Sequence, residues 1–508
     1  MSRILVKFVV PALLAVSAAS RASAALDDTP PAATQESAEQ LARKYQDAMF
    51  DSRFADALAV VDRMHVDPDY TNGVAIADAM RASALLGLKR DSEAHKLIAE
   101  ANSLAPELAE PSSVLFLGAL LTKHFDVAAD TIDRMIARYP DAVRDDVDWE
   151  LMRFFMANEP KAQTQRNEDR TIALAAIGYG GDTERGHYLA KSAVDYLVNR
   201  GDFTKAADLL RYVKEPVALE SMLIQKRYAP LWDQIEQLAG PHFSTVRADS
   251  VSAAKIAYEA NPNDADLLAN YVNTLRHAQL LKQAIALKSK LPSTSEDMAS
   301  ADEDMGWAVN NVAYALDEAG QKADSDRLFA LLNDAKMDGG AWRISMRINR
   351  LELLVGDDRD QLAATLLDRT EAAAKTDGSP FAQQLVRRLQ FCTLSRLGRT
   401  ADAAKRLSDL LAHASDAPGP TIDALLCAGD VDRAEQVALS SLASPDAKKR
   451  RAFEEDFVRQ LQAHPLTSDD PSVWQGRWAE LRKRPRIASA FDRLGRDMPQ
   501  EYLPPPPQ

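Results

Sequence analysis

The sequence predicts an all-α protein, organised as an α-solenoid of stacked helix pairs. Segments of about 12–15 residues carry apolar side chains spaced three and four apart, the periodicity of one helix face. Alanine and leucine are abundant, aromatic residues make up 6% of the chain, and no β-branched run alternates with period two. Landmark residues also recur at a fixed interval, as stacked repeats require.

The first residues have the features of a secretory signal peptide. A positive start at Arg3 and Lys7 precedes an apolar stretch over residues 8–19, and a small-residue pattern follows that ends at Ala24. The apolar stretch is shorter than the roughly 20 residues that a spanning helix needs. We therefore expect an exported protein without a transmembrane segment in the mature chain, periplasmic if the organism has two membranes.

Composition and charge exclude several classes of protein. The 508 residues include 75 acidic and 61 basic ones, which gives a formal net charge of −14. Nucleic acid is therefore not expected as a partner, because binding it needs clustered lysine and arginine to neutralise phosphates. The histidines and cysteines show no metal-ligand spacing, so we expect neither a metal nor another cofactor.

Two adjacent segments match each other after a shift of 34 residues. The matching landmarks are Ala82 with Phe116, Ala94 with Ala128, Ile98 with Ile132, Ala101 with Met135, and Pro106 with Pro140. Small residues at a helix crossing, a proline after the second helix and this period resemble the tetratricopeptide repeat superfamily. The resemblance implies helix pairs that turn at a glycine, which adopts the left-handed conformation with little strain. An irregular helical bundle is the alternative.

Further partial matches extend the pattern along most of the chain. Gly201, Gly320, Gly398 and Gly429 each stand where the first helix of a pair is expected to end. The expected organisation is a signal peptide over 1–24, a flexible linker over 25–37, N-terminal repeats over 38–290, a polar link over 291–304, C-terminal repeats over 305–445, a helical cap with basic clusters over 446–500 and a proline-rich tail over 501–508.

The last part of the chain concentrates positive charge at residues 448–451 and 482–486. A solenoid needs a terminal unit with an altered outer face to close its core, and this is one interpretation of residues 446–500. The other is a peripheral contact surface for an acidic partner or for anionic lipid headgroups. The tail contains four consecutive prolines before Gln508 and should be extended.

No catalytic constellation stands out in the sequence. There is no G-x-S-x-G nucleophile motif, and neither cysteine is paired with a histidine in a recognisable pattern. The enzyme alternative is a polysaccharide-acting protein with a helical superhelix body, either like a lytic transglycosylase or an α/α toroid. The first would need a lysozyme-like domain after the helices, and the second usually has more aromatic residues. We therefore expect no enzyme.

In the tetratricopeptide superfamily, the first helix of each pair lines a concave groove that binds partners. This resemblance implies the following groove residues: Lys191, Asp195, Asn273, Arg276, His277, Asn310, Tyr314 and Asp317. They do not reproduce the lysine and asparagine clamp that some members use for C-terminal carboxylates. The alternative for each residue taken singly is an ordinary solvated helix residue, so the expectation concerns them as a group on one concave surface.

The two cysteines fall late in the first helices of adjacent pairs. Neighbouring first helices lie side by side in such stacks, so a disulfide between Cys392 and Cys427 is geometrically conceivable. Two separate buried thiols are the alternative.

Taken together, these features favour a non-catalytic scaffold of the bacterial cell envelope that binds a peptide or protein partner in its groove. An accessory role in envelope assembly or polysaccharide export follows only by analogy with exported members of the superfamily.

Overall fold

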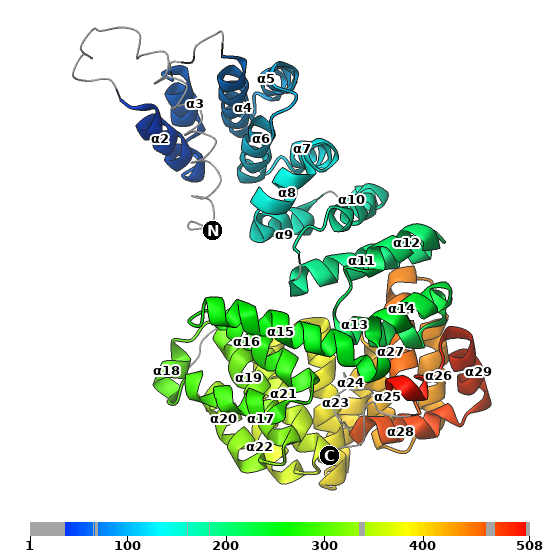
Figure 1. The fold of residues 1–508 in the computed structure, drawn as a ribbon. Coiled ribbons are helices and arrows are strands. Elements are labelled where there is room, and N and C mark those ends of the chain that lie inside the picture. Colours follow the sequence, from blue (N-terminus) through cyan, green and yellow to red (C-terminus); the bar gives the residue numbers. More distant parts are fainter. Residues whose placement is uncertain are drawn as a thin grey trace. The chain divides into compact units, whose positions relative to one another are not determined.

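The computed structural model describes residues 36–64, 66, 70–159, 161–181, 183–334, 341–463 and 473–503. The expected signal peptide, nearly all of the linker and the prolines of the tail lie outside these residues. Within the described part the fold is all-α, as predicted, with 28 α-helices and no strand (Figure 1). An isolated antiparallel β-bridge joins Gln225 to Gly495.

The chain divides into two compact units, and the boundary falls between Tyr212 and Val213. The polar link expected over residues 291–304 is not at this boundary, since it lies inside the second unit. It contains a short helix, α18 (Ser295–Ala299), whose Met298 is fully buried in the core of that unit. The serine-rich composition of this segment therefore reflects a capped helix start at Thr294 and an exposed surface.

The first unit consists of eleven described α-helices. They are α2 (Ala38–Phe50), α3 (Phe54–Asp62), α4 (Thr71–Gly87), α5 (Asp91–Leu104), α6 (Glu110–Leu121), α7 (Phe125–Arg138), α8 (Pro140–Asp146), α9 (Trp149–Asn158), α10 (Thr164–Ala176), α11 (Glu184–Asn199) and α12 (Phe203–Leu210).

Helices α4 to α7 form the two segments that match after a 34-residue shift. Helix α4 packs against both α5 and α6, and α6 packs against α7. Ala82, Ala94 and Ala128 are fully buried where these helices meet. Gly118 of α6 lies so close to α4 that a Cβ atom on it would come 2.1 Å from Ser83 Oγ. Small residues therefore allow the close approach of helix backbones in this unit.

The second unit contains the other helices. They are α13 (Pro216–Ile224), α14 (Trp232–Ala239), α15 (Ser244–Ala260), α16 (Ala265–His277), α17 (Leu281–Ala286), α18, α19 (Glu303–Glu318), α20 (Lys322–Asp334), α21 (Ala341–Gly356), α22 (Asp360–Asp377), α23 (Pro380–Arg396), α24 (Thr400–Ala412), α25 (Pro418–Cys427), α26 (Val431–Leu442), α27 (Ala447–Gln460), α28 (Val473–Arg482) and α29 (Pro485–Leu494).

Helix pairs stack regularly through the middle of the second unit. The pairs α19/α20, α21/α22, α23/α24 and α25/α26 each pack internally, and the first helices α16, α19, α21, α23 and α25 contact one another in that order. Gly320, Gly398 and Gly429 end three of these first helices with φ between 71° and 75°. Asp358 takes the same left-handed conformation after α21, with φ 56°. The turn glycines identified in the sequence therefore stand where the backbone requires them.

The last helices of the second unit pack against its first ones, as Figure 1 shows for α13 and α27. The Ser221 hydroxyl of α13 donates to Glu455 Oε1 at 2.8 Å. The Arg496 backbone N–H donates to the Ile224 carbonyl at 2.8 Å, and its side chain reaches Glu236 at 2.8 Å. The second unit is thus closed by contacts between its own two ends, whereas an open-ended array would leave its terminal pairs apart.

Candidate functional site

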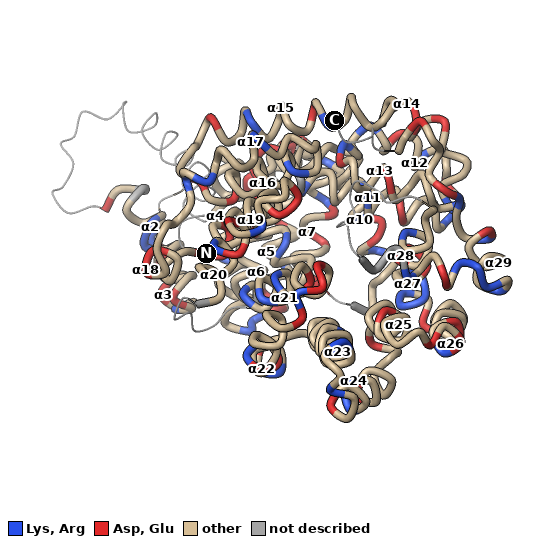
Figure 2. The backbone as a smooth tube through the Cα atoms, turned by 90° about the horizontal axis from the view of Figure 1, so that it is seen from below, with Lys and Arg blue, Asp and Glu red and all other residues tan. Residues whose placement is uncertain are grey.

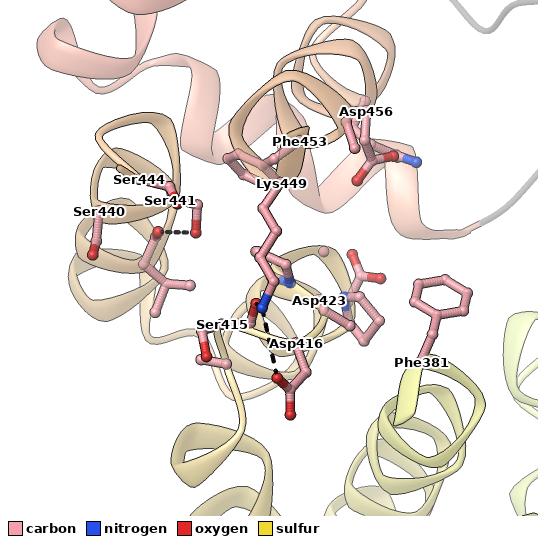
Figure 3. Close-up of a pocket in the computed structure, with 18 of the residues that line it drawn as sticks. Phe381, Ser415, Asp416, Asp423, Ser440, Ser441, Ser444, Lys449, Phe453 and Asp456 are labelled. Atoms are coloured by element: carbon pink, nitrogen blue, oxygen red, sulfur yellow. Dashed lines mark hydrogen bonds and ion pairs between the residues drawn. The ribbon is translucent and has the colours of Figure 1, made fainter. Parts of the chain in front are cut away.

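A cavity of about 910 Å³ lies in the second unit, among the helices from α23 to α28 (Figure 3). Its walls are mainly apolar, with a smaller number of hydroxyl, amide and charged groups. The lining residues are Phe381, Leu385, Arg388, Ala414, Ser415, Asp416, Ala417, Pro418, Gly419, Pro420, Asp423, Gln436, Val437, Ser440, Ser441, Ser444, Pro445, Lys449, Ala452, Phe453, Asp456, Gln460 and Trp478. Cavities of this size and composition are typical of ligand sites.

A buried polar network, made of Arg388, two carboxylates and Trp478, forms part of the cavity wall. Arg388 of α23 donates from Nη1 to Asp423 Oδ2 of α25 at 2.6 Å, and its Nη2 forms an ion pair with Glu352 of α21. The indole Nε1 of Trp478 donates to the other oxygen of Asp423 at 2.7 Å. Both oxygens of Asp423 are therefore engaged, and buried polar groups need such partners because desolvation is costly.

The start of α25 forms one wall of the cavity. Pro418 opens the helix, where the missing N–H of proline costs no hydrogen bond. Gly419 is buried, and a Cβ atom built on it would come 2.9 Å from Asp456 Oδ2 of α27. The absence of a side chain at Gly419 therefore gives the Asp456 carboxylate the room it occupies.

Asp456 has an unusual electrostatic environment. Desolvation by the surrounding protein raises the pKa of its carboxyl to about 6, and the neighbouring Asp423 acts in the same direction. Arg459, a hydrogen bond from Gln460 and Arg388 oppose this shift without cancelling it. The carboxylate is thus held in a site that disfavours its charge.

The rim of the cavity carries one cation and one prominent aromatic ring. Lys449 Nζ donates to the Ser415 carbonyl at 3.3 Å and lies 4.0 Å from Asp416 Oδ1. Phe381 is 53% exposed, which is unusual for a phenylalanine. Figure 3 shows the α26 serines on the side of the cavity opposite Phe381, with Lys449 and Asp416 between them.

A disulfide ties together two of the helices that frame the cavity. Cys392 of α23 and Cys427 of α25 are bonded, with their Cα atoms 5.8 Å apart. Arg477 of α28 donates to the Cys427 sulfur at 2.6 Å. Of the two alternatives left open by the sequence, the structure has the bridge, and it joins the first helices of adjacent pairs.

The structure brings six of the sequence-predicted groove residues together on α16 and α19. Arg276 forms a 2.8 Å ion pair with Glu318 and lies over the ring of Tyr314, 4.7 Å from its centroid. Beside it, burial and the positive charges of Arg276 and Arg247 lower the pKa of His277 to about 4. Asn273 on α16 and Asp317 on α19 are half-buried.

Two of these six side chains do not turn outward as expected. Asn310 is 2% exposed and accepts a hydrogen bond from Asn349 of α21 at 3.1 Å. Tyr314 is 5% exposed and packs edge-on against Phe329. Both are covered because α19 lies between α16 and α21, so these residues pack the interior of the stack.

Lys191 and Asp195 lie apart from this group, on α11 of the first unit. They form an ion pair with each other at 2.8 Å across one helical turn. Such a pair is what residues four apart on a helix commonly make.

Many residues of the two basic clusters bind acidic partners within the second unit. Arg484 pairs with Asp432, Arg482 pairs with Asp497, and Lys449 approaches Asp416. Figure 2 shows acidic residues among the basic ones near α26, α27 and α29. These contacts attach the terminal helices to the rest of the second unit.

The cavity residues were not identified from the sequence. Pro418, Gly419 and Pro420 formed a visible signal for a helix start, but nothing in the sequence connects them with Asp456 or Phe381. Among the described residues, no group of three or more histidine, cysteine or acidic side chains is arranged to hold a metal ion. None of the described helices combines the length and apolar character that crossing a bilayer requires.

No protein-family model matches this sequence, and no curated protein is significantly similar to it.

Proposed function

We propose that this protein is an exported, non-catalytic binding protein that takes a peptide segment of a partner protein into the cavity between α23 and α28. The observation that carries the proposal is the cavity itself, with its apolar walls and fixed polar groups. The stacked helix pairs and the resemblance to tetratricopeptide repeats support the same reading, since such arrays commonly bind peptides. The leader-like first residues support export.

The cavity has apolar residues on one side and hydrogen-bonding groups on another, and a peptide can interact with both. Apolar residues such as Phe381 and Phe453 can take up apolar side chains of a guest. Serine hydroxyls on α26 and the exposed amide of Gln436 can hydrogen-bond a guest backbone. The lining residues include no histidine or cysteine, and Asp423 is already engaged on both oxygens, which disfavours catalysis by a histidine- or cysteine-based mechanism.

A cavity-blocking substitution tests the proposal. Ala452 is exposed on α27 and lines the cavity, so Ala452→Trp places an indole in it without disturbing a buried position. Ala447 is exposed on the same helix but does not line the cavity, and Ala447→Trp is therefore the matched control. A random peptide library is selected on the purified protein, and the affinity of enriched peptides is measured by calorimetry with all three proteins.

The expected result is that Ala452→Trp weakens binding at least about tenfold, while Ala447→Trp binds like the wild type. Equal binding by the two variants would place the guest elsewhere. Release of soluble fragments from peptidoglycan or exopolysaccharide by the purified protein would instead support the polysaccharide-acting alternative.

A further inference from the structure

Five charged side chains line the cavity, and four of them neutralise one another in pairs. Arg388 is paired with Asp423 at 2.6 Å, and Lys449 lies 4.0 Å from Asp416. Asp456 is the fifth, and the two cations that line the cavity in the described part of the chain are both placed against other carboxylates. The cavity therefore carries one unbalanced negative charge.

The surroundings of Asp456 position its carboxylate and compensate its charge only in part. Gln460 donates a hydrogen bond to it, and the Gly419 backbone lies against Oδ2. The charged groups that face it are Arg459 on its own helix, Asp423 on α25 and Arg388 on α23. Because Arg388 is also bound to Asp423 and Glu352, and Arg459 offsets the charge only in part, an incoming cation would find a carboxylate that lacks a full counter-charge.

We propose that the guest peptide carries a lysine or arginine whose cationic group binds Asp456, beside apolar residues that pack on the cavity walls. This inference rests on the proposed function and specifies its ligand. The net charge of −14 supports it, because a strongly acidic protein attracts basic segments and repels acidic ones. An apolar wall next to a single carboxylate also matches the long aliphatic stem of lysine or arginine.

Three peptide pools test the charge preference directly. Each pool holds N-acetylated, C-amidated octapeptides with a fixed central Lys, Gln or Glu, and the other positions are drawn from Ala, Ser, Leu and Phe. Affinity is measured by fluorescence anisotropy at pH 7.5 and low salt. The wild type is compared with Asp456→Asn and with Asp432→Asn, which removes the same charge from an exposed carboxylate of α26 that does not line the cavity.

We expect the Lys pool to bind the wild type about tenfold more tightly than the Gln pool, and the Glu pool to bind most weakly. Asp456→Asn should abolish the preference for Lys, whereas Asp432→Asn should keep it. The preference should also fade between pH 7.5 and pH 5, because a carboxyl with a pKa of about 6 becomes protonated in that interval.

The outcomes separate this inference from the proposed function. If all pools bind equally and Ala452→Trp weakens all of them, the cavity binds peptides but Asp456 does not select a cation. In that case the inference is overturned while the proposed function stands. A preference for the Glu pool overturns the inference as well, and it would indicate that Lys449 is the residue that selects the charge of the guest. If Ala452→Trp weakens no pool, both proposals fail.

Thermal unfolding at pH 7.5 checks folding, and Asp456→Asn should be at least as stable as the wild type because it removes a desolvated charge.

Discussion

The guanidinium of Arg388 and the carboxylate of Asp423 form a buried ion pair 2.6 Å long that joins α23 to α25. Arg388 is 6% exposed and Asp423 is 7% exposed, so Asp423 depends on Arg388 for its counter-charge, while Arg388 is shared with Glu352. The Trp478 indole adds α28 to the same network. This network fixes three of the helices that frame the cavity.

Removing the carboxylate from this network should destabilise the protein strongly. We expect Asp423→Ala to lower the free energy of unfolding by about 3–5 kcal/mol, since it leaves Arg388 buried without one of its two acidic partners. The measurement is urea unfolding followed by circular dichroism. Asp402→Ala is the control, because its ion pair with Arg399 is exposed and should contribute less than about 1 kcal/mol. Equal losses in the two variants would contradict the importance of the buried network.

The close approach of α4 and α6 in the first unit should tolerate no added methyl group. Gly118→Ala would force its Cβ into Ser83, and we expect a loss of about 1–3 kcal/mol. Gly356→Ala is a matched control, because a Cβ on this helical glycine meets no atom within 4 Å. It should be neutral or stabilising by up to about 1 kcal/mol. Thermal unfolding of the two variants measures the difference.

The disulfide should contribute to the stability of the second unit. Replacing Cys392 and Cys427 together by alanine is expected to cost about 2–4 kcal/mol, because the open chain gains entropy when it unfolds. A reductant should lower the free energy of unfolding of the wild type by a similar amount, and it should not change that of the double variant. Peptide mapping without reduction checks the bond itself, and two free thiols in the native protein would contradict it.

His277 should make the second unit sensitive to acid. Its pKa is lowered to about 4, so below the ordinary histidine value the unfolded chain takes up a proton that the folded chain does not. Stability should therefore fall as the pH drops from about 6.5 towards 4, by about 1–2 kcal/mol at pH 5. His277→Gln should reduce this loss while changing stability little at pH 7.5. An unchanged acid dependence in the variant would show that His277 is not the group responsible.

Much of the fold could be predicted because its signals are local. Gly320, Gly398 and Gly429 mark turns through their own backbone conformation, and the buried alanines at positions 82, 94 and 128 mark close crossings through their size. The assignment of residues to a partner-binding groove could not be made from local pattern alone, because it also requires knowing which helix faces stay exposed. Helical periodicity gives the face on which Asn310 and Tyr314 lie, but whether α21 covers that face depends on how the next pair packs.

By itself, the sequence determined the helical class, the pairing of helices and the positions of their turns, because spacing, side-chain size and backbone freedom act over a few residues. Only the tertiary structure decided that the ends of the second unit meet and that Phe381, Asp423, Asp456 and Trp478 surround one cavity. These four residues come from four different helices, and their proximity results from packing between segments that are distant in the chain.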